Sequence, residues 1–291
     1  MNGIIIINKP LGKTSHDMVS FMRRVTGIKK IGHTGTLDPM AEGVLPICIG
    51  KATKAADMLT ADDKGYRAQL VLGMTTDTLD SEGDILSECE VKCTREEIEN
   101  VIKSFIGEVE QIPPMFSAIK QNGKKLYELA RKGIEVERKP RKITINKIDI
   151  LEIDTKNNTV TIDVDCSKGT YIRTLCEDIG AKLGVGAYMN TLVHTKSGIF
   201  NIKDAMSTKD IESLAKQGKL TDSIKSVDSV FGNLDSIYLN EKQTKSVLNG
   251  IRMSYGGRAE GECLRVYGFD GEFLCISQIC EGRLKMLKSF W

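Results

Sequence analysis

One aspartate in this sequence stands in a setting that is typical of a catalytic carboxylate. Asp38 lies within residues 32–46, a stretch that holds three glycines, two prolines and a histidine. Such a density of Gly and Pro marks a loop with fixed backbone angles, and Pro39 disfavours a helical conformation at Asp38. A carboxylate on a stiff loop is a candidate active-site group. The alternative is an ordinary turn in which Asp38 accepts hydrogen bonds from nearby amides.

A second feature is a concentration of positive charge in residues 119–147. This stretch holds ten Lys or Arg and three Glu, a net charge of +7, whereas the whole chain of 291 residues carries only +2. Surfaces that merely face solvent usually mix the two signs, so we interpret the stretch as an element that contacts nucleic-acid phosphates. A solvated surface without a ligand is the alternative. The candidate contacts are Lys124, Lys125, Arg131 and Lys132.

Arg173 is a third candidate because of its expected place in a helix. Thr170 can cap a helix that buries Ile172 and Leu175, which puts Arg173 in the first turn. The helix dipole disfavours a cation at that position. We therefore expect Arg173 to have an anionic partner, although on its own it could be one half of a surface ion pair.

The sequence argues against several other classes of site. The eight cysteines and three histidines do not show the spacing of a zinc site. Gly12-Lys13-Thr14 resembles the end of a phosphate-binding loop, but Ile7 stands where that loop needs a glycine. No segment has the length of a membrane span or the features of a signal peptide. We expect a soluble, cytoplasmic protein with reduced cysteines and no metal or cofactor.

The elements that must position these residues alternate between strands and helices. Apolar and alternating runs predict strands at 3–8, 44–49, 65–72, 142–153, 159–166 and 189–195. Cap signals and helical periodicity predict helices that follow Ser15, Thr94, Thr170 and Ser207 or Thr208, and a further helix at 51–59. After residue 234 the segments become shorter. An Asp270-Gly271 turn there predicts a hairpin in a small β-rich module.

Taken together, these motifs closely resemble those of the bacterial tRNA pseudouridine-55 synthases of the TruB type. The resemblance rests on Gly32-His33-Thr34-Gly35-Thr36-Leu37-Asp38-Pro39 and Gly43-Val44-Leu45-Pro46, with Asn8-Lys9-Pro10 before them and Lys168-Gly169-Thr170-Tyr171-Ile172-Arg173 after them. It covers most of residues 3–231 and continues into a tail that is similar to a PUA-type RNA-binding domain.

The resemblance implies an α+β fold in two domains. Residues 1–231 would form the pseudouridine synthase catalytic domain, with a mixed, mainly antiparallel central sheet flanked by helices. Residues 119–147 would be an RNA-gripping insertion in that domain. Residues 232–291 would form a small, β-rich, PUA-like RNA-binding domain.

The resemblance also implies an activity and a set of site residues. The family flips one uridine, position 55 in the T-loop of tRNA, out of its stack, breaks the bond from C1′ to N1 and joins C1′ to C5, without a metal or cofactor. Asp38 would be the catalytic carboxylate, Tyr66 would stack on the target base and take part in proton transfer, and Arg173 would pair with Asp38. We expect that pair to be bidentate. The pocket for the nucleotide would include His33, Tyr171, Leu192 and Lys9.

Two other functions would fit parts of this pattern. A non-catalytic protein that binds and folds tRNA on the same scaffold needs the basic stretch and the tail but not Asp38. A metal-dependent nuclease needs clustered carboxylates, and Asp38 has only Glu42 near it in the sequence. Release of tritium from C5 of uridine without chain cleavage distinguishes a synthase from both. We expect a monomer that binds the T-arm of tRNA and no membrane.

Overall fold

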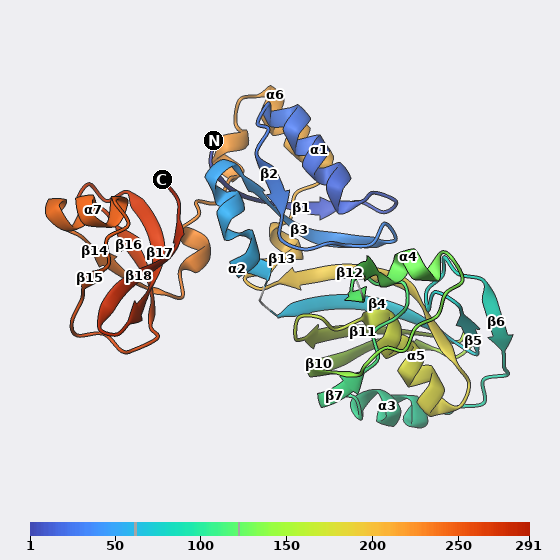
Figure 1. Cartoon of the computed structure of the whole chain (residues 1–291). Helices are drawn as coiled ribbons and strands as arrows, with labels where there is room; N and C mark the ends of the chain where they lie inside the picture. The colour runs from blue at the N-terminus through green and yellow to red at the C-terminus, as the bar shows by residue number, and fades with distance from the viewer. Residues whose placement is uncertain (61–62, 122) are drawn as a thin grey trace.

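A large mixed β-sheet organises the N-terminal part of the chain (Figure 1). The structure is a computed structural model, and it describes residues 1–60, 63–121 and 123–291. In order across the sheet, the main strands are β1 (Gly3–Lys9), β3 (Ala41–Ile49), β12 (Ala187–Ser197), β4 (Lys64–Leu72), β11 (Thr159–Cys166), β10 (Arg141–Asp154) and β7 (Gly107–Gln111). Two short strands extend it, β2 (Ile31–His33) beside β3 and β13 (Phe200–Asn201) beside β12.

The pairing in this sheet agrees with the expected fold. Only β12 and β3 run parallel, and the other described pairs of the sheet are antiparallel. The predicted mixed, mainly antiparallel sheet is therefore confirmed. Strand β12 lies between β3 and β4, and so joins the part of the sheet that follows the Asp38 loop to the part that carries Tyr66 (Figure 1).

Helices flank the sheet, as predicted. They are α1 (Ser15–Thr26), α2 (Ala56–Thr60), α3 (Arg95–Lys103), α4 (Leu126–Ala130), α5 (Ile172–Leu183) and α6 (Thr208–Lys216). Four 3-10 turns accompany them, η1 (Gly50–Ala55), η2 (Ile202–Asp204), η3 (Leu220–Ser223) and η4 (Ser229–Phe231). The helix predicted at 51–59 is thus η1 followed by α2, a tight turn that continues into a short helix.

The predicted helix starts are correct in two cases and displaced by one residue in two others. Thr94 and Ser207 cap α3 and α6 as expected. Helix α1 is capped by Thr14, which exchanges hydrogen bonds with Asp17 in a capping box. Ser15 instead holds the Asp38 loop, because its hydroxyl donates to the Leu37 carbonyl and accepts from the Leu37 amide. The residue before α5 is Tyr171 and not Thr170.

Apolar side chains fill the space between the sheet and its helices. Helices α3 and α5 contribute Ile98 and Leu175 to a cluster that packs on Ala68 and Ile162 of the sheet. Helices α1 and α6 pack on β1 and β3 in a second cluster, whose buried members include Met22, Ile47 and Ile211. Burial of these faces removes apolar surface from water and supplies most of the driving force for the fold.

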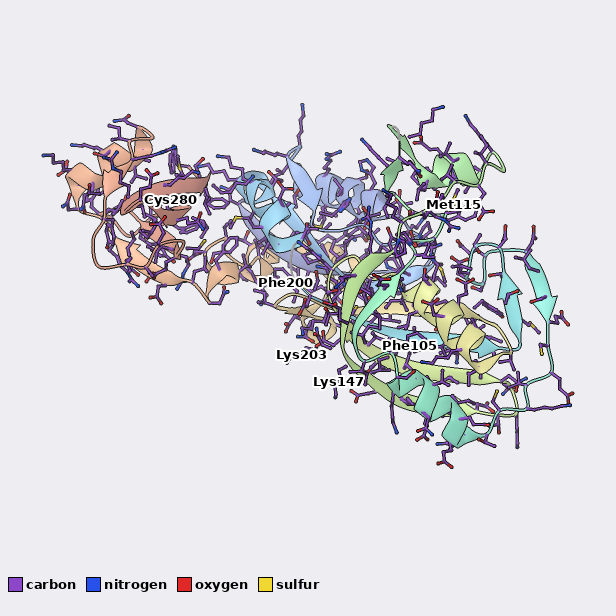
Figure 2. All side chains as sticks on the ribbon, turned by 60° about the horizontal axis from the view of Figure 1, so that its bottom comes forward. Phe105, Met115, Lys147, Phe200, Lys203 and Cys280 are labelled. Carbon is purple, nitrogen blue, oxygen red and sulfur yellow. The ribbon has the colours of Figure 1, made fainter. Side chains whose placement is uncertain are left out.

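A smaller sheet forms the C-terminal unit. Its strands, in order, are β14 (Asp235–Tyr238), β16 (Cys263–Tyr267), β17 (Phe273–Cys280), β18 (Arg283–Ser289) and β15 (Met253–Ser254), with helix α7 (Glu241–Leu248) beside them. The predicted hairpin joins β16 to β17, and Gly271 there has φ of 80°. Ile276 and Phe290 of this unit share an apolar cluster with Ile4 and with Phe200, which is labelled in Figure 2.

Two small hairpins project from the large sheet and were not predicted. One pairs β5 (Met74–Thr76) with β6 (Ile85–Glu88), and the other pairs β8 (Lys120–Gln121) with β9 (Lys124–Lys125). Met115, labelled in Figure 2, lies just before the segment that contains the second hairpin and α4. The connection between β5 and β6 lines the cleft described below, and so do residues of and next to α4, which follows the second hairpin.

A buried lysine holds the Asp38 loop at the residue after Asp38. The side chain of Lys9 is 0% exposed, and its ammonium group donates to the carbonyl oxygens of Pro10, Lys13 and Pro39. Burial lowers the pKa of Lys9, and the carboxylates of Glu42, Asp38 and Asp17 oppose that shift. The predicted contact between Lys9 and the substrate does not agree with this interior position. Lys9 instead holds Pro39, and therefore the residue before it, in place.

Replacement of Lys9 by methionine tests this interpretation. Methionine fills similar space but leaves three carbonyl oxygens without their donor, so we expect Lys9→Met to lower the free energy of unfolding by about 1–3 kcal/mol. Urea unfolding followed by circular dichroism measures this through a lower midpoint at constant slope. The exposed lysine in Lys29→Met is the matched control, and it should change stability by less than about 0.5 kcal/mol. Equal midpoints for both variants would contradict the assignment.

Candidate active site

A cleft of about 710 Å³ opens where the Asp38 loop, β4, α5 and the segment before α4 meet. Several predicted site residues lie in its wall, and the loop that precedes β6 contributes polar groups to it. The predicted residues that line the cleft are Asp38, Tyr66, Arg131, Tyr171, Arg173 and Leu192. The structure thus brings together side chains from five separate parts of the sequence.

Arg173 forms the electrostatic centre of the cleft. One nitrogen of its guanidinium group donates to Asp38 Oδ2 at 3.0 Å and to the Phe116 carbonyl at 2.9 Å. The other terminal nitrogen donates to Asp80 Oδ2 at 3.0 Å. The expected anionic partner of Arg173 is therefore present. The expected bidentate pair is wrong, because the guanidinium group is shared between two carboxylates and makes a single hydrogen bond to each.

The two carboxylates around Arg173 differ sharply in exposure. The Asp80 side chain is 4% exposed, whereas the Asp38 side chain is 50% exposed. Asp80 also accepts hydrogen bonds from the Thr78 hydroxyl at 2.6 Å and from the Glu82 amide at 3.1 Å. A buried ion pair with further hydrogen bonds is costly to break from one side. Asp80 is therefore an anchor that holds Arg173, and Asp38 is the carboxylate that remains available to a ligand.

Sequence reasoning missed Asp80. It lies in the connection between β5 and β6, where Leu79 adopts a φ of 66° that is uncommon for a residue other than glycine. A polar stretch of this kind is typical of any surface turn, so its composition does not distinguish a buried carboxylate. The signal that could have found it was the number of N–H donors on a buried guanidinium group, which a single carboxylate does not satisfy.

A clamp on the main chain sets the position of Arg173. Gln111, at the end of β7, is 4% exposed, and its side-chain amide donates to the Tyr171 carbonyl and accepts from the Tyr171 amide. These bonds, of 3.0 and 2.8 Å, hold the residue that precedes α5. Arg173, two residues later, therefore enters the cleft from a fixed helix terminus and not from a mobile loop.

Tyr66 lies on the central strand β4 and is half-buried at the cleft wall. Its ring stacks on that of His194, with ring centroids 4.9 Å apart and 25° between the ring planes. Burial raises the pKa of the Tyr66 phenol above its ordinary value, and Cys166 and Asp38 add to the shift. The phenol is therefore a neutral hydrogen-bonding group near Asp38 at physiological pH.

The basic insertion reaches the cleft through two residues. Tyr127, on α4, contacts the cations of Lys125 and Arg131, which are 5.3 and 5.4 Å from its ring centroid. Tyr127 and Arg131 line the cleft. Lys124 and Lys132 are exposed on the same insertion and are not among the lining residues. The predicted basic element therefore borders the cleft, with part of its charge directed to solvent.

His33 is half-buried on β2, outside the set of residues that line the cleft. Its Nδ1 atom is buried without a hydrogen-bond partner in the described part of the chain, and burial lowers the pKa of its imidazole. The side chain is thus a neutral ring with one unused polar atom. Leu192, by contrast, lies in the cleft, opposite Ala68 of β4.

No metal centre is formed by the described residues. Within 1–60, 63–121 and 123–291, no group of three or more His, Cys, Asp or Glu side chains is arranged to hold a metal ion. No helix in the described ranges is both long and apolar enough to cross a membrane.

Comparison with known proteins identifies the family. Residues 23–172 match the N-terminal domain model of the TruB family pseudouridylate synthases, and residues 173–232 match a tRNA pseudouridylate synthase B C-terminal domain. The tRNA pseudouridine synthase B of Clostridium perfringens is 46% identical over 294 residues, which is 99% of this chain and 98% of that protein. The corresponding protein of Clostridium acetobutylicum is 45% identical over 292 residues, 99% of each chain.

Solved structures agree with this result. A Cbf5-Nop10-Gar1 complex contains a chain that is 26% identical, with a TM-score of 0.76 over 99% of this chain and 85% of that one. An archaeal box H/ACA Nop10-Cbf5 complex gives a TM-score of 0.73 at 25% identity, over 99% and 86% of the two chains. The sequence matches span both sheets and include every residue of the cleft described above. The chain therefore belongs to the TruB family of pseudouridylate synthases.

Proposed function

We propose that this enzyme converts uridine 55, in the T-loop of tRNA, to pseudouridine, with Asp38 as its catalytic carboxylate. The observation that carries the proposal is the half-exposed Asp38 carboxylate, 3.0 Å from a buried arginine and in the same cleft as Tyr66. A fixed negative charge next to an open space suits a reaction that develops positive charge at a sugar carbon. Relatives that are named tRNA pseudouridine synthase B support tRNA as the substrate.

The cleft is suited to a nucleotide that has left its stack. The target base lies inside folded tRNA, so it must be flipped out at a cost of a few kcal/mol. Tyr66 offers a flat aromatic face to the extruded uracil, and Leu192 and Tyr171 would border it. The flipped nucleotide would then lie with its C1′ atom near Asp38 and its base near Tyr66.

Asp38 would act at C1′ while the base changes its point of attachment. The C1′–N1 bond breaks, the base turns, and C1′ forms a bond to C5. C5 then loses its hydrogen as a proton, while N1 gains a proton, so that atoms and charge balance. Asp38 can assist by attacking C1′ as a nucleophile or by stabilising its positive charge. The Tyr66 hydroxyl is the neutral group placed to pass protons at the base.

Arg173 would keep the Asp38 carboxylate aimed at the substrate. Because Asp80 and the Phe116 carbonyl also hold its guanidinium group, Arg173 stays in place when Asp38 turns toward the sugar. A preorganised charge of this kind needs no rearrangement during the reaction. His33 would support the T-loop after the base has left it.

The insertion and the C-terminal unit would bind the rest of the tRNA. We assign residues 1–231 to the catalytic domain, with 119–147 as its RNA-gripping insertion, and residues 232–291 to a PUA-like RNA-binding domain. Phosphate contacts from Lys124, Lys125, Arg131 and Lys132 would offset the cost of base flipping. A monomer would suffice, because one chain supplies all the groups named above.

The first test removes the charge of Asp38 and keeps its shape. In Asp38→Asn we expect loss of tritium release from tRNA that is labelled at uridine C5, because the carboxylate carries the chemistry. Affinity for tRNA should stay within about tenfold, or ~1.4 kcal/mol. Asp57→Asn, at a side chain that is 91% exposed, serves as the control and should remain active. Normal turnover by Asp38→Asn would refute the assignment.

The second test asks whether the forked geometry of Arg173 matters. Lysine keeps the charge, but its single ammonium group does not reproduce bonds to Asp38, Asp80 and the Phe116 carbonyl together. We expect Arg173→Lys to reduce the single-turnover rate by a factor of about one hundred, the scale of a small misplacement. Arg24→Lys, at a surface ion pair, is the control. A near wild-type rate for Arg173→Ala would show that Arg173 has no catalytic role.

The third test concerns the basic insertion. Replacement of Lys124, Lys125, Arg131 and Lys132 by glutamine should weaken tRNA binding and flatten its dependence on salt, by up to ~0.9 in logarithmic slope for each lost phosphate contact. Glutamine at the exposed residues Lys29, Lys30, Lys216 and Lys219 makes the same change in net charge elsewhere. Filter binding at several salt concentrations distinguishes the two variants. If the insertion variant and the control variant had identical salt slopes for tRNA binding, the insertion would be only a solvated surface.

A further inference from the structure

A histidine lies directly behind Tyr66, on the neighbouring strand. His194 of β12 is the register partner of Tyr66 on β4, and the two rings stack with their centroids 4.9 Å apart. His194 is 5% exposed, whereas Tyr66 reaches the cleft. One face of the Tyr66 ring is therefore covered by imidazole, which leaves the opposite face for a base.

The imidazole of His194 is itself held rigidly by the main chain. Its Nδ1 atom is 2.6 Å from the Val44 carbonyl oxygen. Burial lowers the pKa of His194 to about 4, so the ring is neutral at physiological pH. A carbonyl oxygen only accepts hydrogen bonds, so Nδ1 must carry the ring proton and donate it. The ring therefore has one fixed tautomer and one fixed plane.

This hydrogen bond connects β12, the strand beside that of Tyr66, to β3, the strand that follows the Asp38 loop. Val44 belongs to β3, which begins at Ala41, soon after Asp38. The main chains of β3 and β12 approach closely here. A Cβ added at Gly43 would lie 2.2 Å from the His194 carbonyl oxygen, and Gly43 has φ of 104°, so only glycine fits at this position. His194 thus contacts β3 through its Nδ1 atom and Tyr66 through its ring face.

We infer that His194 is a positioning residue, which fixes the distance and tilt of the Tyr66 ring relative to Asp38. The inference rests on the proposed function, in which uracil stacks on the open face of Tyr66. The bound state would then be a stack of three rings, with uracil, Tyr66 and His194 in that order. Aromatic pairs of this kind gain stability from an offset, near-parallel arrangement, and a misplaced reacting group slows the reaction steeply.

A purely structural role for His194 makes a different prediction. If the side chain only fills space and satisfies the Val44 carbonyl, its replacement should lower stability and leave the chemical step unchanged. If it positions Tyr66, loss of the aromatic face should slow the chemical step even in a folded enzyme. The two roles can be separated because the ring and the hydrogen bond can be removed independently.

Three variants of the full-length protein provide this separation. His194→Asn keeps a donor near the position of Nδ1 and removes the ring. His194→Phe keeps a ring and removes the donor, while His194→Leu removes both and retains an apolar side chain of similar burial. Each is measured for tritium release in a single turnover at saturating enzyme, for tRNA affinity, and for its urea midpoint.

We expect the rate to follow the ring. His194→Asn and His194→Leu should be slower by about tenfold or more, with tRNA affinity within about threefold, and His194→Phe should lie within about threefold of wild type. The Phe and Leu variants both lack the donor, so their difference reports the aromatic face even if the Asn variant is poorly folded. Equal rates for Phe and Leu, or rates that follow the urea midpoints, would overturn the inference.

The wild-type enzyme keeps the two proposals distinguishable. If wild type releases no tritium from tRNA, the proposed function itself fails. If wild type is active and all three variants match it, only the positioning role of His194 fails. A loss of affinity without a change in the single-turnover rate would also overturn that role, because it would place His194 in binding and not in the alignment of Tyr66.

Discussion

The shared guanidinium group of Arg173 is the interaction on which the cleft depends. It joins the Asp38 loop, the connection between β5 and β6, and the carbonyl of Phe116 in one set of hydrogen bonds. These segments are distant in the sequence, and Arg173 adds a side-chain link between them to the main-chain pairing that Ala41 and Asp80 each make with β12. A buried cation with only one carboxylate would leave much of its hydrogen-bonding capacity unused. The second carboxylate, Asp80, lets Asp38 stay half-exposed without weakening the site.

The rest of the fold serves to hold that set of groups at fixed distances. Lys9 and Ser15 fix the two sides of the Asp38 loop by bonds to its main chain. Gln111 fixes the start of α5, and His194 supports Tyr66 from behind. Each of these four side chains lies behind the groups that border the cleft. The enzyme thus relies on order that exists before tRNA binds, which reduces the rearrangement required during the reaction.

Much of this could be predicted from residue types and spacing, because several signals are local. The Gly- and Pro-rich setting of Asp38, the cap before α3 and the turn at Asp270-Gly271 each depend on a few adjacent residues. The burial of Lys9 and the role of Asp80 depend on segments that are distant in sequence, and no local pattern contains them. The sharing of the Arg173 guanidinium group between two carboxylates was missed for the same reason, since Asp38 and Asp80 lie in different loops.

The place of β12 in the sheet has a consequence for how the enzyme is made. In the described sheet, β12 is the strand that joins β3 to β4, so the loop of Asp38 and the strand of Tyr66 have no common neighbour until Ala187–Ser197 arrives (Figure 1). Pairing between such distant segments must pay the entropy of closing a long loop, and contacts of this kind form slowly. A chain that has just emerged from the ribosome up to α5 would hold every acidic and aromatic group of the cleft, yet would not be able to assemble it.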